Sequence, residues 1–183
     1  QRTSILSFDW RTLQVVQKEA PEIATVYLTA QRDWADNVGA GQAQPSPWTA
    51  GFRYADHGSV PKLIKAAGGR IWSCYHGDLD AAKVAEAHAL GISVLAWTVN
   101  EPGLIARILD LGVDGIVTDR PDRVRAEMQR RGLPLPLATP VHWGAEPFRM
   151  GDSADGITQE RYFFFWFTRF TRYWQHEIAG KGE

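Results

Sequence analysis

The sequence is short of several features that would tie it to a compartment or a partner. Cys74 is the single cysteine, so an intrachain disulfide is excluded and a reducing, cytoplasmic location is favoured. No apolar run reaches the roughly eighteen residues of a membrane-spanning helix. The net charge of −1 gives no general attraction to nucleic acid or anionic membranes. What remains is a chain of 183 residues, 44% of them hydrophobic, which is enough for one domain with a core.

The N-terminus lacks both an initiator methionine and a signal sequence. The first residues, QRTSILSF, enter an apolar run almost at once. We therefore expect the chain to begin inside a larger protein.

Two hydrophobic periods alternate along the first two thirds of the chain. Helical spacing is found over 9–22, 58–69, 78–91, 101–112 and 120–132. Short apolar runs typical of buried strands fall at 4–8, 24–29, 70–76, 92–99 and 113–119. Buried strands separated by single helices predict an α/β fold with a parallel sheet. Gly91 and Gly112 each follow a helix and suit the left-handed conformation that ends one.

The segment 31–57 interrupts this alternation. It is long, rich in glycine, proline and glutamine, and carries Trp34, Trp48 and Phe52. Loops of this length in compact domains are often functional, so a binding or lid role and a plain insertion both stay open.

Polar and aromatic residues collect where the predicted strands end. Ligands of parallel α/β proteins bind at the carboxyl ends of the strands, where this chain places Phe8, Tyr75, Trp97 and Asn100. A tryptophan offers a flat apolar wall, and an asparagine offers a donor and an acceptor, which together suit a polyol or a phosphate ester. Two structural alternatives remain: Trp97 belongs to the core, and Asn100 caps the helix that starts at Pro102.

Three strings of the chain together resemble a known family. SILSFDWRTLQVVQKEAPEIATVYL, AHALGISVLAWTVNEP and LGVDGIVTDRPDRVR are similar, in this order, to the C-terminal part of the glycerophosphodiester phosphodiesterase family. The match runs from residue 4 to about residue 136. The resemblance implies the C-terminal portion of a (β/α)8 TIM barrel. It also implies hydrolysis of glycerophosphodiesters to sn-glycerol 3-phosphate and an alcohol, with a divalent metal ion, Mg or Ca, in the complete enzyme.

The part of the family pattern that carries the catalytic chemistry is missing. Its HRG…ENT and HD histidine motifs and its E-x-D and E-x-K metal motifs do not occur in these 183 residues. We therefore assign no catalytic residue and no metal ligand, and expect no metal bound by this chain alone. Phe8, Tyr75, Trp97 and Asn100 are instead assigned to the substrate-side wall.

YHGDLD is the only local cluster with metal-ligand chemistry. His76, Asp78 and Asp80 lie close together after a strand, but Asp78 or Asp80 is more simply the cap of the following helix. Asp119, before Pro121, is in the same way expected to cap the last helix. Cys74 is interpreted as a small packed residue.

The C-terminal segment has no counterpart in the family. Residues 137–158 read as a linker, and 159–178 as an amphipathic helix with Phe163, Phe167, Phe170 and Trp174 on one stripe. Packing on the chain itself or on a partner, contact with a membrane interface, and unrelated sequence past a frameshift all stay open for this tail.

Two hypotheses of different classes follow. In the first, residues 1–136 are a partial phosphodiesterase domain that binds a glycerophosphodiester and needs a missing N-terminal half or a second copy of the chain. In the second, they form a non-catalytic half-barrel that serves as a binding or interaction module. Neither involves nucleic acid.

Overall fold

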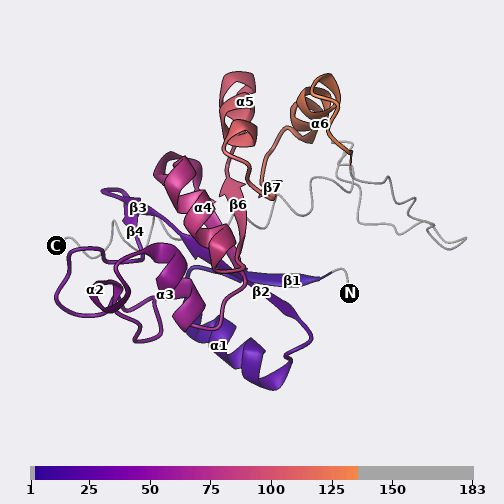
Figure 1. Cartoon of the computed structure of the whole chain (residues 1–183). Coiled ribbons are helices and arrows are strands. Elements are labelled where there is room, and N and C mark those ends of the chain that lie inside the picture. The colour runs from indigo at the N-terminus through magenta and orange to yellow at the C-terminus, as the bar shows by residue number, and fades with distance from the viewer. Residues whose placement is uncertain (1–2, 136–183) are drawn as a thin grey trace, which may run out of the picture. The chain divides into compact units, whose positions relative to one another are not determined.

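The computed structural model describes residues 3–135, and its contacts divide the chain after Thr118 into two units. The first unit contains every strand and five α-helices of the described part (Figure 1). Its strands are β1 (Ser4–Ser7), β2 (Ala24–Thr29), β3 (Gln31–Arg32), β4 (Ala35–Asp36), β5 (Ile71–Tyr75), β6 (Ser93–Trp97) and β7 (Gly115–Ile116). Its helices are α1 (Trp10–Glu19), α2 (Tyr54–His57), α3 (Val60–Ala66), α4 (Ala81–Ala89), α5 (Pro102–Asp110) and the short 3-10 turn η1 (His76–Asp78).

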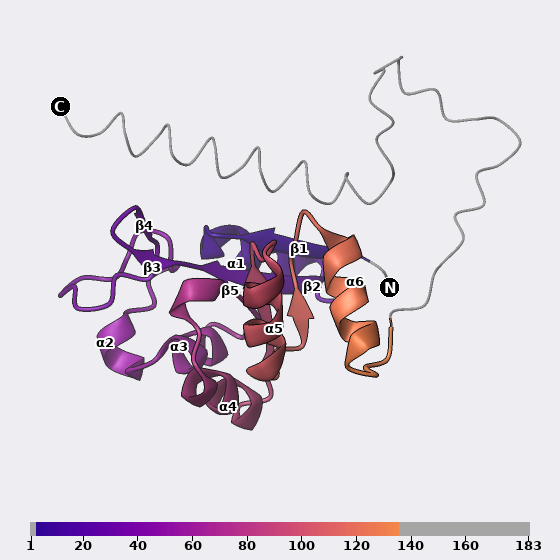
Figure 2. The ribbon, with the colours of Figure 1, turned by 90° about the horizontal axis from the view of Figure 1, so that it is seen from above.

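The main sheet is parallel and is built in one direction. Its strand order is β1-β2-β5-β6-β7, and each neighbouring pair runs parallel. When right-handed crossovers add each new strand at the same edge of a parallel sheet, the connecting helices all lie on one face of that sheet. Figure 2 shows α3, α4 and α5 together on one side of the strands. The predicted α/β fold with a parallel sheet is confirmed, and β1 and β7 are the edges of this sheet.

Short side chains begin several helices where the sequence indicates. Asp9, Ser59 and Asp80 are the N-caps of α1, α3 and α4, and each side chain accepts a backbone N–H of the first turn. Gly91 and Gly112 adopt φ values of +71° and +75° directly after α4 and α5, which confirms their predicted role.

The side of the sheet that faces the helices is packed and its polar groups are paired. Tyr27 of β2 lies edge-on to Trp10 of α1 at 4.9 Å between ring centroids. Its hydroxyl donates to the carbonyl of Ala67 at 2.8 Å and accepts from Gln14 at 2.8 Å. Trp72 pairs in register with Tyr27, and its indole N–H donates to the hydroxyl of Thr29 at 2.7 Å. Burial raises the pKa of Tyr27 against the opposing effect of its glutamine hydrogen bonds.

The segment 31–57 is anchored to the sheet by a buried asparagine. It begins with the antiparallel hairpin β3–β4 and ends with α2, which the sequence did not indicate. Asn37 has no exposed surface; its amide donates to the carbonyls of Phe8 and Leu28, and its oxygen accepts the N–H of Ala30. Three backbone groups at the ends of β1 and β2 are therefore satisfied by one side chain.

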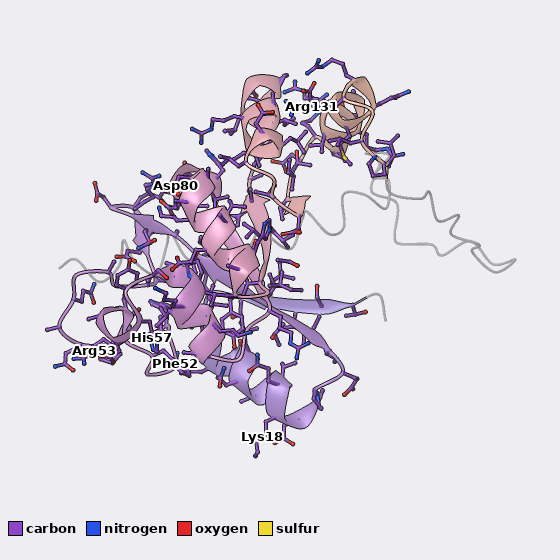
Figure 3. All side chains as sticks on the ribbon, in the orientation of Figure 1. Lys18, Phe52, Arg53, His57, Asp80 and Arg131 are labelled. Carbon is purple, nitrogen blue, oxygen red and sulfur yellow. The ribbon has the colours of Figure 1, made fainter. Side chains whose placement is uncertain are left out.

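The second unit is described only as far as residue 135. It contains α6 (Pro121–Arg130), in which Glu127 pairs with Arg130 and with Arg131, the latter labelled in Figure 3. Arg120, not Asp119, is the N-cap of α6, so the predicted Asp119 cap is wrong. The aromatic helix and linker predicted over 137–178 lie outside the described residues. Within 3–135, no helix has the length and apolarity needed to cross a bilayer.

Candidate functional site

Four aromatic rings form a continuous row at the carboxyl edge of the sheet. Trp97 contacts Phe8 edge-on, with ring centroids 5.7 Å apart, and Tyr75 at 5.4 Å. Tyr75 in turn contacts Trp34, in the turn of the β3–β4 hairpin, at 5.1 Å. Tyr75 and Trp97 are register partners on β5 and β6, which explains why their side chains leave the sheet on the same face. We call these residues, Phe8, Trp97, Tyr75 and Trp34, the aromatic row.

The aromatic row runs from the interior to solvent. Phe8 is 2% exposed and Trp97 4%, whereas Tyr75 is half-buried and Trp34 is 48% exposed. The indole N–H of Trp97 donates to the carbonyl of Ser73 at 3.1 Å, so its polar edge is satisfied within the chain. Trp34 and Tyr75 are therefore the members of the row that solvent reaches, and Trp97 and Phe8 lie behind them.

The structure brings together three of the four predicted wall residues, and it places the fourth, Asn100, in the loop that follows Trp97 and β6. The oxygen of Asn100 accepts a hydrogen bond from the hydroxyl of Thr118 at 3.0 Å, which links the segments that follow β6 and β7. Glu101 is the N-cap of α5, without a side-chain capping bond. The alternative in which Asn100 caps this helix is therefore wrong. The role of these residues in binding stays a prediction.

Three cations surround the turn η1 that follows β5. Arg107 of α5 donates to the carbonyl of His76 at 3.4 Å, and Lys83 of α4 donates to that of Asp78 at 2.6 Å. Arg32 of β3 donates to the carbonyl of Gly77 between them, and its guanidinium lies 5.4 Å from the ring centroid of Tyr75. We call Arg32, Lys83 and Arg107 the cation cluster. Two of these cations, Arg32 and Lys83, pair with the carboxylates of Asp78 and Asp80, and Arg107 does not.

The acidic residues of this turn are already occupied. Asp78, 6% exposed, pairs with Arg32 at 2.7 Å and accepts the N–H of Gln31 at 2.8 Å. Asp80 caps α4 by accepting the N–H of Lys83 at 2.8 Å, as predicted. Figure 3 shows Asp80 at the first turn of α4.

The residues of the described part do not fit the divalent metal that the family resemblance implies. Nowhere in residues 3–135 do three or more His, Cys, Asp or Glu side chains come close enough to share an ion. A hard cation takes six or more oxygen ligands, and the one enclosed carboxylate of this edge, Asp78, is committed to Arg32.

Two titratable groups near the row are held in their neutral forms. Burial, reinforced by Arg107 and Arg32, lowers the pKa of His76, and its enclosed Nδ1 has no hydrogen-bond partner among the described residues. Burial raises the pKa of Cys74, whose thiol lies within the core. His76 is thus an uncharged ring beside that of Tyr75, with centroids 4.4 Å apart and the ring planes tilted by 40°.

Reasoning from sequence missed the cation cluster. Arg32 and Gly77 are 45 positions apart, and no local pattern connects them. Trp34 carried a signal as an aromatic residue in a long segment, but its position over Tyr75 depends on the β3–β4 hairpin.

Comparison with known proteins identifies the family to which this chain is similar. The model of the "Glycerophosphoryl diester phosphodiesterase family" matches residues 1–123. The chain is 49% identical over 51 residues to the probable glycerophosphodiester phosphodiesterase 2 of Mycobacterium tuberculosis, where the match covers 28% of this chain and 19% of that protein. It is 40% identical over 47 residues to the putative glycerophosphodiester phosphodiesterase YhdW of Bacillus subtilis, covering 26% of this chain and 19% of the relative.

Solved structures give the same result over a longer stretch. A putative glycerophosphoryl diester phosphodiesterase from Silicibacter pomeroyi is 38% identical, with a TM-score of 0.59, over 72% of this chain and 39% of that one. A phosphodiesterase from Oleispira antarctica, solved in complex with the product sn-glycerol-3-phosphate, shares the fold at 21% identity and a TM-score of 0.50, over 70% of this chain and 43% of that one. The chain thus spans about a fifth of the curated relatives and about two fifths of the solved ones. By its family match and its parallel sheet, which aligns to part of these barrels, the chain belongs to the glycerophosphoryl diester phosphodiesterase family.

Proposed function

We propose that the chain forms the substrate-side wall of a glycerophosphodiester phosphodiesterase. The complete enzyme would hydrolyse glycerophosphodiesters to sn-glycerol 3-phosphate and an alcohol. The observation that carries the proposal is the aromatic row at the carboxyl edge of a parallel sheet, in a chain of this family. The sn-glycerol-3-phosphate complex of the Oleispira antarctica protein supports the substrate class.

The proposed role of the row is to enclose the glycerol and head-group carbons of the substrate. Phe8, Tyr75 and Trp97 supply apolar ring surface that excludes water from the ester. Asn100, held through its oxygen by Thr118, would present its amide N–H groups toward an ester or hydroxyl oxygen.

The acid–base and metal chemistry would come from outside residues 3–135. When bound, a divalent ion polarises the phosphodiester and a histidine pair transfers protons. The described residues offer no fitting ligand set, and the family's HRG…ENT and HD histidine motifs do not occur in the sequence. We therefore infer that the 183-residue chain alone is inactive, with residues 1–136 as its barrel domain, 137–158 as a linker and 159–178 as a tail. A cytoplasmic location is part of the same proposal.

The second candidate is a non-catalytic half-barrel that binds ligands or partners. The open edges β1 and β7 favour it, because unpaired strand edges recruit other strands. The proposed partner is then a second copy of the chain rather than a missing N-terminal half.

A complementation assay separates the two candidates. Release of sn-glycerol 3-phosphate from glycerophosphocholine is measured for the chain alone and for a fusion. The fusion carries, ahead of residue 4, the N-terminal region of the Silicibacter pomeroyi protein that precedes its matched part. We expect no EDTA-sensitive turnover from the chain alone and restored turnover in the fusion. Turnover by the isolated chain would refute its inactivity, and a folded fusion that binds substrate without turnover would favour the binding module.

A further inference from the structure

We propose that the outer half of the aromatic row selects substrates whose alcohol is an uncharged polyol and rejects those that carry an ammonium group. The residues that make this selection are Arg32 and Arg107 of the cation cluster, with Trp34 and Tyr75 as the surface that the head group covers. This inference rests on the proposed function, because it concerns the alcohol half of the same diester.

Trp34 and Tyr75 are the two members of the row that solvent reaches, and their rings meet edge-on at 5.1 Å. They lie at the outer end of a row whose inner end, Phe8 and Trp97, is enclosed. If the glycerol phosphate binds at the inner end, the alcohol leaves toward solvent past Trp34.

Aromatic rings alone would favour a cationic alcohol. Ring faces attract ammonium groups within about 6 Å of their centroid, as the trimethylammonium of choline would be. At Tyr75 this place is already taken, because the guanidinium of Arg32 lies 5.4 Å from its centroid. Arg32 is fixed there by Asp78 and by the carbonyl of Gly77, so a ligand cannot displace it without leaving Asp78 unpaired in an enclosed position.

The remaining charges add to the same effect. Arg107 donates to the carbonyl of His76 and forms no ion pair with any residue of the described part, so its charge is not neutralised by a neighbouring carboxylate. Lys83 is balanced by Asp80 at 3.4 Å. Asp33, in the turn of the hairpin, and Arg107 are both exposed, so water weakens the attraction of the one and the repulsion of the other alike. An ammonium group would therefore find the ring face of Tyr75 occupied by Arg32 and would meet, at Arg107, a cation without a paired carboxylate in the described part of the chain.

A polyol meets the same surface without this conflict. Its carbon skeleton covers the rings of Trp34 and Tyr75, and its hydroxyl oxygens accept from guanidinium N–H groups. The neutral His76 ring beside Tyr75 adds no charge of its own. The chemical class that fits is thus a diester of glycerol phosphate with glycerol or a cyclic polyol.

The test compares two ligands on the full chain. Dissociation constants for glycerophosphoglycerol and glycerophosphocholine are measured by calorimetry and by tryptophan fluorescence. We expect glycerophosphoglycerol to bind roughly tenfold more tightly, the size of one like-charge contact in largely aqueous surroundings. Arg107→Gln should reduce that ratio severalfold without exposing an unpaired carboxylate, and Arg32→Gln should remove or reverse it. Arg53→Gln is the matched control, because Arg53 also pairs with an aspartate of its own segment, Asp56, and lies well apart from Asp80 in Figure 3.

Each outcome has a separate meaning. Equal affinities, or tighter binding of glycerophosphocholine, overturn the head-group inference and leave the proposed function intact, since both ligands still bind. Binding of neither ligand to the chain, with equal binding of both to the fusion described above, overturns the head-group inference alone, whereas binding of neither ligand to the folded fusion overturns both. A ratio that survives Arg32→Gln and Arg107→Gln in variants with unchanged melting temperatures also overturns the inference, because the preference would then arise elsewhere. Trp34→Ala should weaken both ligands alike.

Discussion

Two tryptophans on neighbouring strands show how differently the two faces of this sheet are completed. Trp72, on the helix-facing side, is 1% exposed and donates to Thr29, a side chain of the adjacent strand. Trp97, three positions beyond the strand partner of Trp72, faces the other side among rings that lead to solvent. Both are buried, yet only the first lies in a layer that this chain completes by itself.

The buried polar groups of the two faces differ in the same way. On the helix-facing side the hydroxyl of Tyr27 has donors and an acceptor within the chain. On the other side the enclosed hydroxyl of Ser73 has no hydrogen-bond partner among the described residues, and Leu95 is only half-buried. Buried polar groups are normally paired. The comparison teaches that the helix-facing layer holds this chain together, whereas the inner face is built to meet another surface.

Truncation of the helix-facing tryptophan, Trp72, should have the largest effect on stability. Trp72→Ala should cost about 3–5 kcal/mol of unfolding free energy, because it opens a large cavity and leaves Thr29 without its donor. Urea unfolding followed by circular dichroism measures it. Trp34→Ala, at a site that is 48% exposed, is the control and should change stability by about 0.5 kcal/mol or less. Equal losses would mean that the helix-facing layer is not the main core.

The second largest effect on stability is expected at Asn37, which anchors the 31–57 segment. Asn37→Asp keeps the shape but replaces two amide donors by a carboxylate beside the carbonyls of Phe8 and Leu28. We expect a loss of about 2–4 kcal/mol in unfolding free energy. Asp36→Asn, next to it and exposed, retains an oxygen for the N–H groups of Val38 and Gly39 and should be nearly neutral. A tolerated Asn37→Asp would show that the segment is held by other contacts.

Trp97→Ala tests the inner side in the complete enzyme, for which the fusion described above serves. If Trp97 forms part of the substrate wall, kcat/KM should fall about a hundredfold, equivalent to about 2–3 kcal/mol. Melting temperature is measured on the same variant, because a ring that is 4% exposed also contributes to packing. Trp97→Phe, which keeps an apolar ring but loses the bond to Ser73 and part of the ring surface, is the milder partner. Loss of stability with unchanged kinetics of the folded fraction would assign Trp97 to the core and withdraw most support from Phe8.

The smallest effect on stability is expected at His76, the neutral histidine beside Tyr75. Burial and two arginines lower the pKa of His76 below its ordinary 6.5, so the unfolded chain takes up the proton first as the pH falls. The stability contributed by the neutral ring is therefore fully present above about pH 6.5 and is lost as the pH falls below it. The change should be a few tenths to about 1 kcal/mol, since the ring is only half-buried. Melting curves from pH 7.5 to 5 on His76→Gln should lack this component, whereas His57→Gln should retain it.

Local patterns were sufficient at Asp80, one of the two residues predicted to cap the helix after β5. Asp9 and Ser59 cap helices in the same way, because a short oxygen side chain reaches N–H groups two or three positions away. The same reasoning failed for Asn100 and Asp119, where Glu101 and Arg120 occupy the cap positions. The β3–β4 hairpin was also not predicted, because its two-residue strands are too short to show a hydrophobic period.

By itself the sequence determined the order of the helices and strands outside 31–57, the parallel sheet, the family and the end of the sheet where aromatic residues collect. These follow from hydrophobic period, capping chemistry and contiguous motifs. Only the tertiary structure decided that Trp34 extends the row, that Arg32 lies against Tyr75 and that Asp78 is committed to Arg32. Such contacts join residues more than forty positions apart, as from Arg32 to Gly77 at a separation of 45, and their geometry depends on the register of strands that no local pattern encodes.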